Sequence, residues 1–123
     1  VIAKYNVVSA PVAARMALGA AAASGSDIAV SVTGVAGPTG GDEVRPVGTV
    51  YLGAARGDTV YVQKLFVSRP DRALVRARAA QAALALALRL AQGEVSAHTK
   101  PLAASEQHSA AALDALNEAF LAE

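Results

Sequence analysis

A glycine-dense segment between two β-favouring stretches constrains the fold of this chain more than any other feature. Residues 28–33 read Ile-Ala-Val-Ser-Val-Thr, a stretch that is too short for a helix and rich in β-branched side chains, which predicts a buried strand. Glycines crowd residues 34–48, and glycine lets a backbone turn sharply and approach a ligand closely. Because α/β proteins build sites for small anions and nucleotides in this way, Thr33 stands at the mouth of a candidate site.

The same segment has a purely structural interpretation. Its glycines can serve the geometry of a wide connection, and Thr33 can cap a turn at the end of the strand. The residues alone leave both interpretations open. Other hydroxyls are weaker candidates, because Ser31 falls inside the buried-strand pattern, Ser24 ends a helix, and neither has a base at recognisable spacing.

A helix is predicted over residues 10–23. Ser9 suits its N-cap, Pro11 falls in its first turn, and Gly25 ends it. At helical spacing, one face of this helix carries Val12, Met16, Gly19, Ala20 and Ala23.

A hairpin is predicted in the middle of the chain. Residues 48–56 and 59–67 read as strands, and Gly57-Asp58 is a two-residue turn with glycine in first position. Arg56-Gly57-Asp58 also matches an adhesion motif, but a hairpin turn explains the triplet more simply.

A long helix is predicted over residues 70–92, starting at Ser68 or Pro70 and ending before Gly93. Its solvated face carries Arg78, Gln81, Arg89 and Gln92, and the opposite, apolar face carries Ala79, Ala83, Leu86 and Leu90. Arg72 and Arg76 project from this apolar side, near the positive end of the helix dipole, where an anion is favoured. Spacing alone does not separate a ligand role from side chains that reach solvent or pair with a carboxylate such as Asp71.

The remainder, residues 93–123, has a different character. Residues 94–106 are polar, are broken by Pro101, and read as a loop. Residues 104–121 have helical periodicity, with Leu113, Leu116 and Phe120 on one stripe, and we expect a helix docked on the domain rather than a partner-binding helix. His98 and His108 lack neighbours at ligand spacing, so we expect surface residues and no metal site.

Composition limits the function classes. The chain has 123 residues, which is enough for one hydrophobic core. It is 54% hydrophobic but only 4% aromatic, so we expect the core to be stabilised by many contacts between small side chains. A net charge of +1 gives no excess of positive charge that would attract nucleic acid or an anionic membrane. The absence of cysteine excludes disulfides, thiolate catalysis and zinc–thiolate sites within this sequence. No signal-like segment opens it, and arginines interrupt the long apolar helix, so we expect a cytoplasmic protein.

The glycine segment also resembles one family. SVTGVAGPTGG, an acidic spacer and RPVGTVY are similar to the C-terminal domain of the CinA family, the nicotinamide-nucleotide amidase domain. The resemblance continues in KYNVVS (residues 4–9) and in SRPDR (residues 68–72) with Val75-Arg76. It divides the chain into a partial amidase domain, residues 1–92, and a C-terminal part, residues 93–123. The fold that it implies is a layered α/β/α sandwich with a mixed sheet, lacking its N-terminal elements and so exposing a sheet edge.

The resemblance implies hydrolysis of the carboxamide of nicotinamide mononucleotide to nicotinic acid mononucleotide and ammonia, without a cofactor. Its partner is a small nucleotide, with no role for nucleic acid or membranes, and a homodimer is possible. Thr33 and Arg72 match catalytic positions of the family. The matching substrate-binding positions are Gly34, Gly37, Gly40 and Arg76.

Two further parts of the family's site have no match in this sequence. An amide hydrolase needs a nucleophile and a base, which the family takes from a Glu-Ser-Cys-Thr-Gly-Gly loop and the lysine of a Tyr-Ser-Asn-x-x-x-Lys segment. Pro70 also replaces a family glycine beside Arg72. We therefore expect this chain to be inactive alone, and the alternative is a non-catalytic nucleotide-binding or interaction module.

Overall fold

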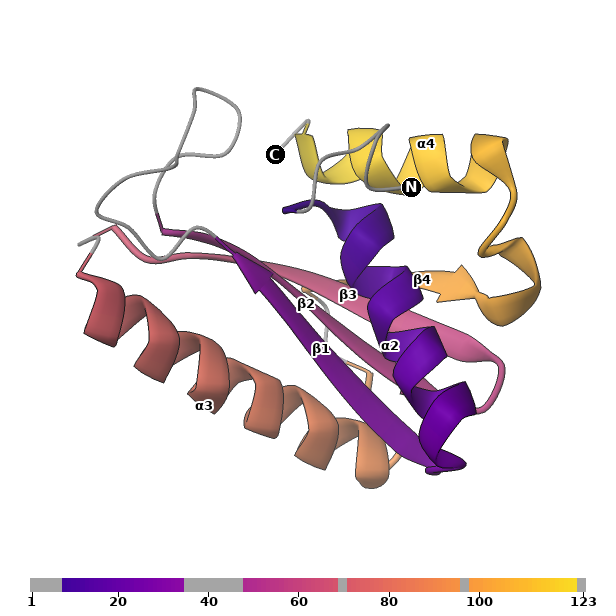
Figure 1. The fold of residues 1–123 in the computed structure, drawn as a ribbon, viewed down its shortest axis with the longest axis horizontal. Helices are drawn as coiled ribbons and strands as arrows, with labels where there is room; N and C mark the ends of the chain where they lie inside the picture. The colour runs from indigo at the N-terminus through magenta and orange to yellow at the C-terminus, as the bar shows by residue number, and fades with distance from the viewer. Residues whose placement is uncertain (1–7, 35–47, 69–70, 96–97, 122–123) are drawn as a thin grey trace.

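The computed structural model describes residues 8–34, 48–68, 71–95 and 98–121 (Figure 1). One helix is followed by three consecutive strands, a long helix, a fourth strand and a last helix. In chain order the elements are α2 (Ala10–Ser24), β1 (Ile28–Gly34), β2 (Thr49–Arg56), β3 (Thr59–Phe66), α3 (Arg72–Ala91), β4 (Thr99–Ala103), a 3-10 turn η1 (Ala104–Glu106) and α4 (Ala110–Leu121).

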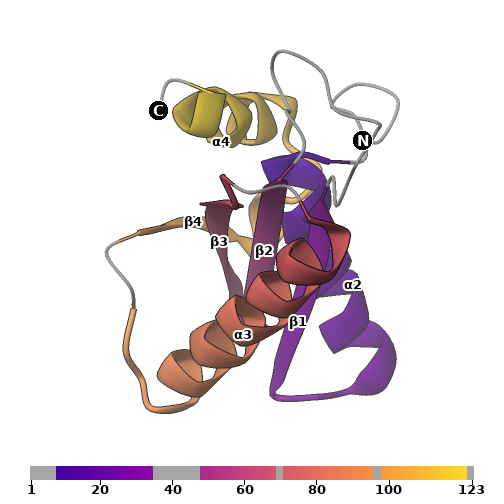
Figure 2. The same ribbon diagram turned by 90° about the vertical axis from the view of Figure 1, so that its left-hand side faces the viewer.

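The elements form three layers. A 4-stranded sheet in the order β1-β2-β3-β4 is covered by α2 and α4 on one face and by α3 on the other (Figures 1 and 2). The predicted α/β/α sandwich is confirmed. Each described pair of strands is antiparallel, whereas a mixed sheet was expected. A parallel pair needs a long crossover connection, and neighbours in this sheet are also neighbours in sequence.

Alternation along β2 divides the core in two. Tyr51 and Ala55 point toward α2 and α4, while Val50, Leu52 and Ala54 point toward α3. The predicted hairpin is confirmed, because Arg56 pairs with Thr59 across a turn whose Gly57 has a left-handed φ of 62°. The triplet Arg56-Gly57-Asp58 is therefore part of this hairpin.

The bounds of α2 follow its local signals, but its buried face does not follow the predicted grouping. Ser9 is the N-cap and Gly25 ends the helix with a φ of 66°. Val12 of the predicted face is buried, but Met16 is 44% exposed, and the buried face continues through Ala10, Ala13, Ala14, Ala17 and Leu18. Small side chains are favoured there because the helix lies so close to the sheet.

That close approach has a specific partner. The Ser31 hydroxyl donates a hydrogen bond of 2.6 Å to the carbonyl oxygen of Ala13. A Cβ at Gly53, which pairs with Ser31, would lie 2.6 Å from the same oxygen. The sheet therefore needs a glycine at this position for α2 to pack against it.

The long helix α3 begins later than predicted. Its N-cap is Asp71, whose carboxylate accepts hydrogen bonds from the amides of Ala73 (2.8 Å) and Leu74 (3.3 Å). An acidic N-cap satisfies two donors at once, which explains why the helix starts here and not at Ser68 or Pro70. At the other end, the Arg56 guanidinium donates to the carbonyl oxygen of Leu90.

The C-terminal part contains a strand where a loop was predicted. β4 pairs with β3, and Pro101 lies opposite Tyr61. Proline is tolerated because β4 is at the edge of the sheet, where one side of the strand needs no donor. The docked helix is confirmed, because the predicted stripe of Leu113, Leu116 and Phe120 is buried.

The opposite edge of the sheet is β1. In the part of the chain that the structure describes, no strand pairs with its outer side. The prediction of a buried strand is confirmed for Ser31 and Thr33 but is wrong for Val30 and Val32, which are 39% and 42% exposed on the α3 side. Among the described helices, none is long and apolar enough to cross a membrane.

Candidate functional site

Thr33 lies at the C-terminal end of β1, on the face of the sheet that α2 and α4 cover. It pairs with Tyr51, whose side chain belongs to the core beneath these helices. Side chains of directly paired residues share a face, so the side chain of Thr33 also faces α2 and α4. Thr33 is the second-last residue of β1 and is buried, and the glycine segment follows it in the sequence.

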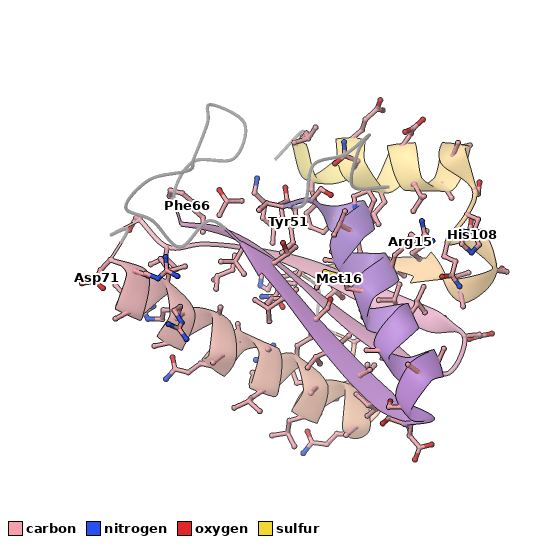
Figure 3. The ribbon with its side chains drawn as sticks, viewed as in Figure 1. Arg15, Met16, Tyr51, Phe66, Asp71 and His108 are labelled. Carbon is pink, nitrogen blue, oxygen red and sulfur yellow. The ribbon has the colours of Figure 1, made fainter. Side chains whose placement is uncertain are left out.

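Further hydroxyl side chains are buried at the same end of this face. Thr49 and Tyr51 are two residues apart on β2, so both side chains lie on the same face as Thr33. Ser9 is the N-cap of α2. The hydrogen bond between Ser31 and Ala13 holds the first turn of α2 over the middle of β1. Figure 3 shows Tyr51 near the N-terminal end of α2, below α4. The result is a polar end to an otherwise apolar layer.

Gly34 has a packing role that the structure makes plain. A Cβ at this position would lie 2.8 Å from Cγ2 of Val50 and 2.9 Å from the carbonyl oxygen of Thr49. The absence of a side chain therefore lets β1 end close against β2, and this alone accounts for a glycine here. A ligand contact by its backbone remains a proposal.

A groove of about 390 Å³ lies on the other face, between the end of β1 and the first turns of α3. It brings together Gly34 and Arg76 among the residues that the sequence marks as substrate-binding. The other lining residues are apolar: Val32, Val50, Val75, Ala79 and Ala80. One guanidinium in an apolar groove can bind the charged end of a ligand that is otherwise apolar.

Arg72 is the first residue of α3 and is exposed. A cation in the first turn opposes the helix dipole, so Arg72 contributes nothing to the helix by its charge. Within the described residues, the structure gives neither Arg72 nor Arg76 a hydrogen bond or ion pair, so the alternative of a pairing with Asp71 is not formed. Both guanidinium groups are therefore available to an anion.

The predicted site residues thus approach one end of the sheet from different faces. Thr33 faces α2 and α4, whereas Arg76 lines the groove beside α3. Arg72 starts α3 next to Asp71, which Figure 3 shows at the far end from the β2–β3 turn. Gly37 and Gly40 lie outside the described residues, as does the segment that links β1 to β2.

Two residues at this end were not among the site residues that the sequence predicted. Tyr51 pairs with Thr33 on one side and with Lys64 on the other, so the three side chains form a row across three strands. The hairpin turn at Gly57-Asp58 could have predicted the pairing of Tyr51 with Lys64. No short-range signal predicted the pairing with Thr33, because a long connection separates β1 from β2.

The two histidines are the remaining candidates for metal ligands. His98 and His108 are exposed, as expected. No group of histidine, aspartate or glutamate side chains in the described ranges could hold a metal ion.

Comparison with known proteins gives this geometry a family context. The CinA C-terminal domain family matches residues 1–91. A protein from Escherichia coli K12 named nicotinamide-nucleotide amidohydrolase PncC is 44% identical over 85 residues, which are 68% of this chain and 50% of that protein. Another so named, from Enterobacter agglomerans, is 45% identical over 86 residues, 70% of this chain and 52% of its own length. A CinA-like protein from Geobacter is 52% identical over 75 residues, 61% of this chain and 18% of that protein.

Solved structures of similar proteins agree with this family match. A competence/damage inducible protein from Agrobacterium tumefaciens superposes with a TM-score of 0.70 at 33% identity, covering 73% of this chain and 55% of that one. A CinA superfamily protein from Escherichia coli gives 0.67 at 35% identity, covering 72% and 51%. This chain therefore spans about half the length of the amidohydrolases that it matches. From residue 1 to residue 91, the chain belongs to the CinA C-terminal domain family.

Proposed function

We propose that this chain is part of an amidohydrolase that acts on nicotinamide mononucleotide. Water adds to the carboxamide carbon, the C–N bond breaks, and nicotinic acid mononucleotide and ammonia leave. The observation that carries the proposal is identity of about 45% to proteins named nicotinamide-nucleotide amidohydrolase. The match to the family runs through Thr33, the glycine segment and Arg72.

The residues of this chain supply binding and positioning in the proposed reaction. Thr33 provides a hydroxyl at the reacting amide, either as a hydrogen-bond donor to the developing oxyanion or as an orienting group for the nucleophile. Arg72 and Arg76 supply positive charge toward the nucleotide, and the backbone of Gly34, Gly37 and Gly40 approaches it closely. The serine and lysine of the family's motifs come from sequence that is not among these 123 residues.

Ammonia release tests the proposal. The 123-residue chain is assayed alone and fused to an N-terminal segment that carries the family's serine and lysine motifs. We expect background rates from the chain alone and turnover from the fusion, since a missing nucleophile leaves only the assistance of binding and oxyanion contacts. Robust activity from the chain alone would assign the nucleophile to a residue within it, with Thr33 the first to be examined.

The absence of the nucleophile motif favours one alternative, a non-catalytic module that binds nucleotides. A fusion that binds nicotinamide mononucleotide but releases no ammonia would support that alternative over the enzyme. For the assembly we propose a homodimer in the cytoplasm. Light scattering of the fusion at the mass of one protomer would contradict the dimer.

A further inference from the structure

The row formed by Thr33, Tyr51 and Lys64 defines one face at one end of the sheet. Thr33 pairs with Tyr51, and Tyr51 pairs with Lys64, so all three side chains project toward α2 and α4. Adjacent strands lie about 4.8 Å apart, which sets the backbones of Thr33 and Lys64 about 10 Å from each other. A mononucleotide can bridge that separation, whereas its amide group alone cannot.

The ammonium group of Lys64 lies over one aromatic ring of this row. Its Nζ lies 5.9 Å from the centroid of the Tyr51 ring, within the range of a cation–π interaction. The Tyr51 ring is fixed in turn, because it is 1% exposed and meets Phe120 edge-on at 5.7 Å. Lys64 is half-buried, and within the described ranges no carboxylate pairs with it. The charge is therefore placed by packing while its hydrogen-bond donors stay available.

The cations that the sequence marks for substrate lie elsewhere. Arg76 lines the groove on the α3 face, and Arg72 begins the same helix. On the face that carries Thr33, Lys64 is the cation that the strand register brings toward it. Lys100 is on the same face, but it belongs to β4, one strand further out, and its Nζ lies over Phe120 at 5.3 Å.

We propose that Lys64 binds the phosphate of a nucleotide whose reacting group lies at Thr33. This inference rests on the proposed function, and it assigns the phosphate contact to the α2 and α4 side of the sheet instead of the groove beside Arg76. A lysine ammonium suits the task because it binds phosphate as a point charge and needs no fixed fork of donors.

Calorimetric titration of the 123-residue chain tests the assignment with three ligands. Nicotinamide mononucleotide carries both groups, nicotinamide riboside lacks the phosphate, and ribose 5-phosphate lacks the nicotinamide. The variants are Lys64→Gln, Lys64→Arg and the matched control Lys100→Gln, which removes the other lysine that lies over an aromatic ring. Thermal unfolding of each variant verifies that it is folded.

We expect Lys64→Gln to weaken binding of both phosphate-bearing ligands by about tenfold or more, because a charge-assisted hydrogen bond is lost. Binding of the riboside should not change, Lys64→Arg should retain most of the affinity, and Lys100→Gln should match the wild type. Wild-type affinity for the mononucleotide in Lys64→Gln would overturn the inference and leave the proposed function standing. An equal loss for all three ligands would assign Lys64 a structural role and would also overturn it.

The remaining outcomes separate the two proposals. If ribose 5-phosphate binds in a Lys64-dependent way but nicotinamide adds no affinity, the phosphate contact stands and the proposed substrate is wrong. If the wild type binds neither phosphate-bearing ligand, the assignment of Lys64 is wrong, and ammonia release by the fusion tests the proposed function separately.

Discussion

The ring of Phe120 meets the ring of Tyr51 edge-on, with centroids 5.7 Å apart and planes at 90°. This contact joins α4, which lies beyond the residues that the family matches, to the strand position that pairs with Thr33. Edge-to-face pairs stabilise beyond the area that they bury. The C-terminal helix is thus part of the same core as the candidate site.

Removing the Phe120 ring should destabilise the chain. We expect Phe120→Ala to lower the free energy of unfolding by about 3–5 kcal/mol, because it leaves a cavity against Tyr51. Leu121→Ala is the matched control, since Leu121 is 42% exposed in the same turn, and it should cost less than about 0.5 kcal/mol. Urea unfolding followed by circular dichroism measures both. A loss of less than about 0.5 kcal/mol in Phe120→Ala would show that this ring does not contribute to the core.

Ending the chain at residue 91 should expose the edge of β3. The shortened chain would lack β4 and the three buried side chains of α4. Unpaired edge strands associate with other strands, so we expect self-association in gel filtration and loss of a cooperative unfolding transition. A monomer with wild-type stability would show that residues 1–91 fold without the C-terminal part.

Gly53 should not tolerate a side chain. A Cβ there would lie 2.6 Å from the carbonyl oxygen of Ala13 and 2.7 Å from the hydroxyl of Ser31. We expect Gly53→Ala to push α2 off the sheet at a cost of about 1–3 kcal/mol, read from denaturant midpoints. Gly19→Ala, in the same helix but with nothing within 4 Å, should instead stabilise by about 0.5–1 kcal/mol. Destabilisation by both changes would point to a general intolerance of α2.

The contribution of Arg72 is tested in the fusion that restores the amidase motifs. Arg72→Ala should lower kcat/KM by about 10–100-fold, because a neutral side chain cannot replace a charge-assisted contact. Arg78→Ala, on the exposed side of the same helix, should leave the rate of ammonia release near that of the parent. A parent-like rate in Arg72→Ala would remove Arg72 from the proposed site.

Local signals were enough for the parts of the fold that depend on neighbouring residues. Ser9 and Gly25 bound α2, Gly57 turns the hairpin, and the stripe ending at Phe120 is the buried face of α4. Capping, left-handed turns and helical periodicity act over a few residues, so the sequence displays them directly. The glycine segment was specific enough to indicate the family.

Longer-range packing decided the rest. The buried face of α2 depends on how closely Gly53 lets the helix approach, and Pro101 sits in a strand because the edge of β3 is open to it. The register of β1 against β2 places Thr33 beside Tyr51 and on the opposite face from Arg76. Sequence alone predicted which residues could take part in the proposed chemistry. Only the tertiary structure decided which of them share a face, because strand pairing across a long connection is set by the packing of the whole sheet.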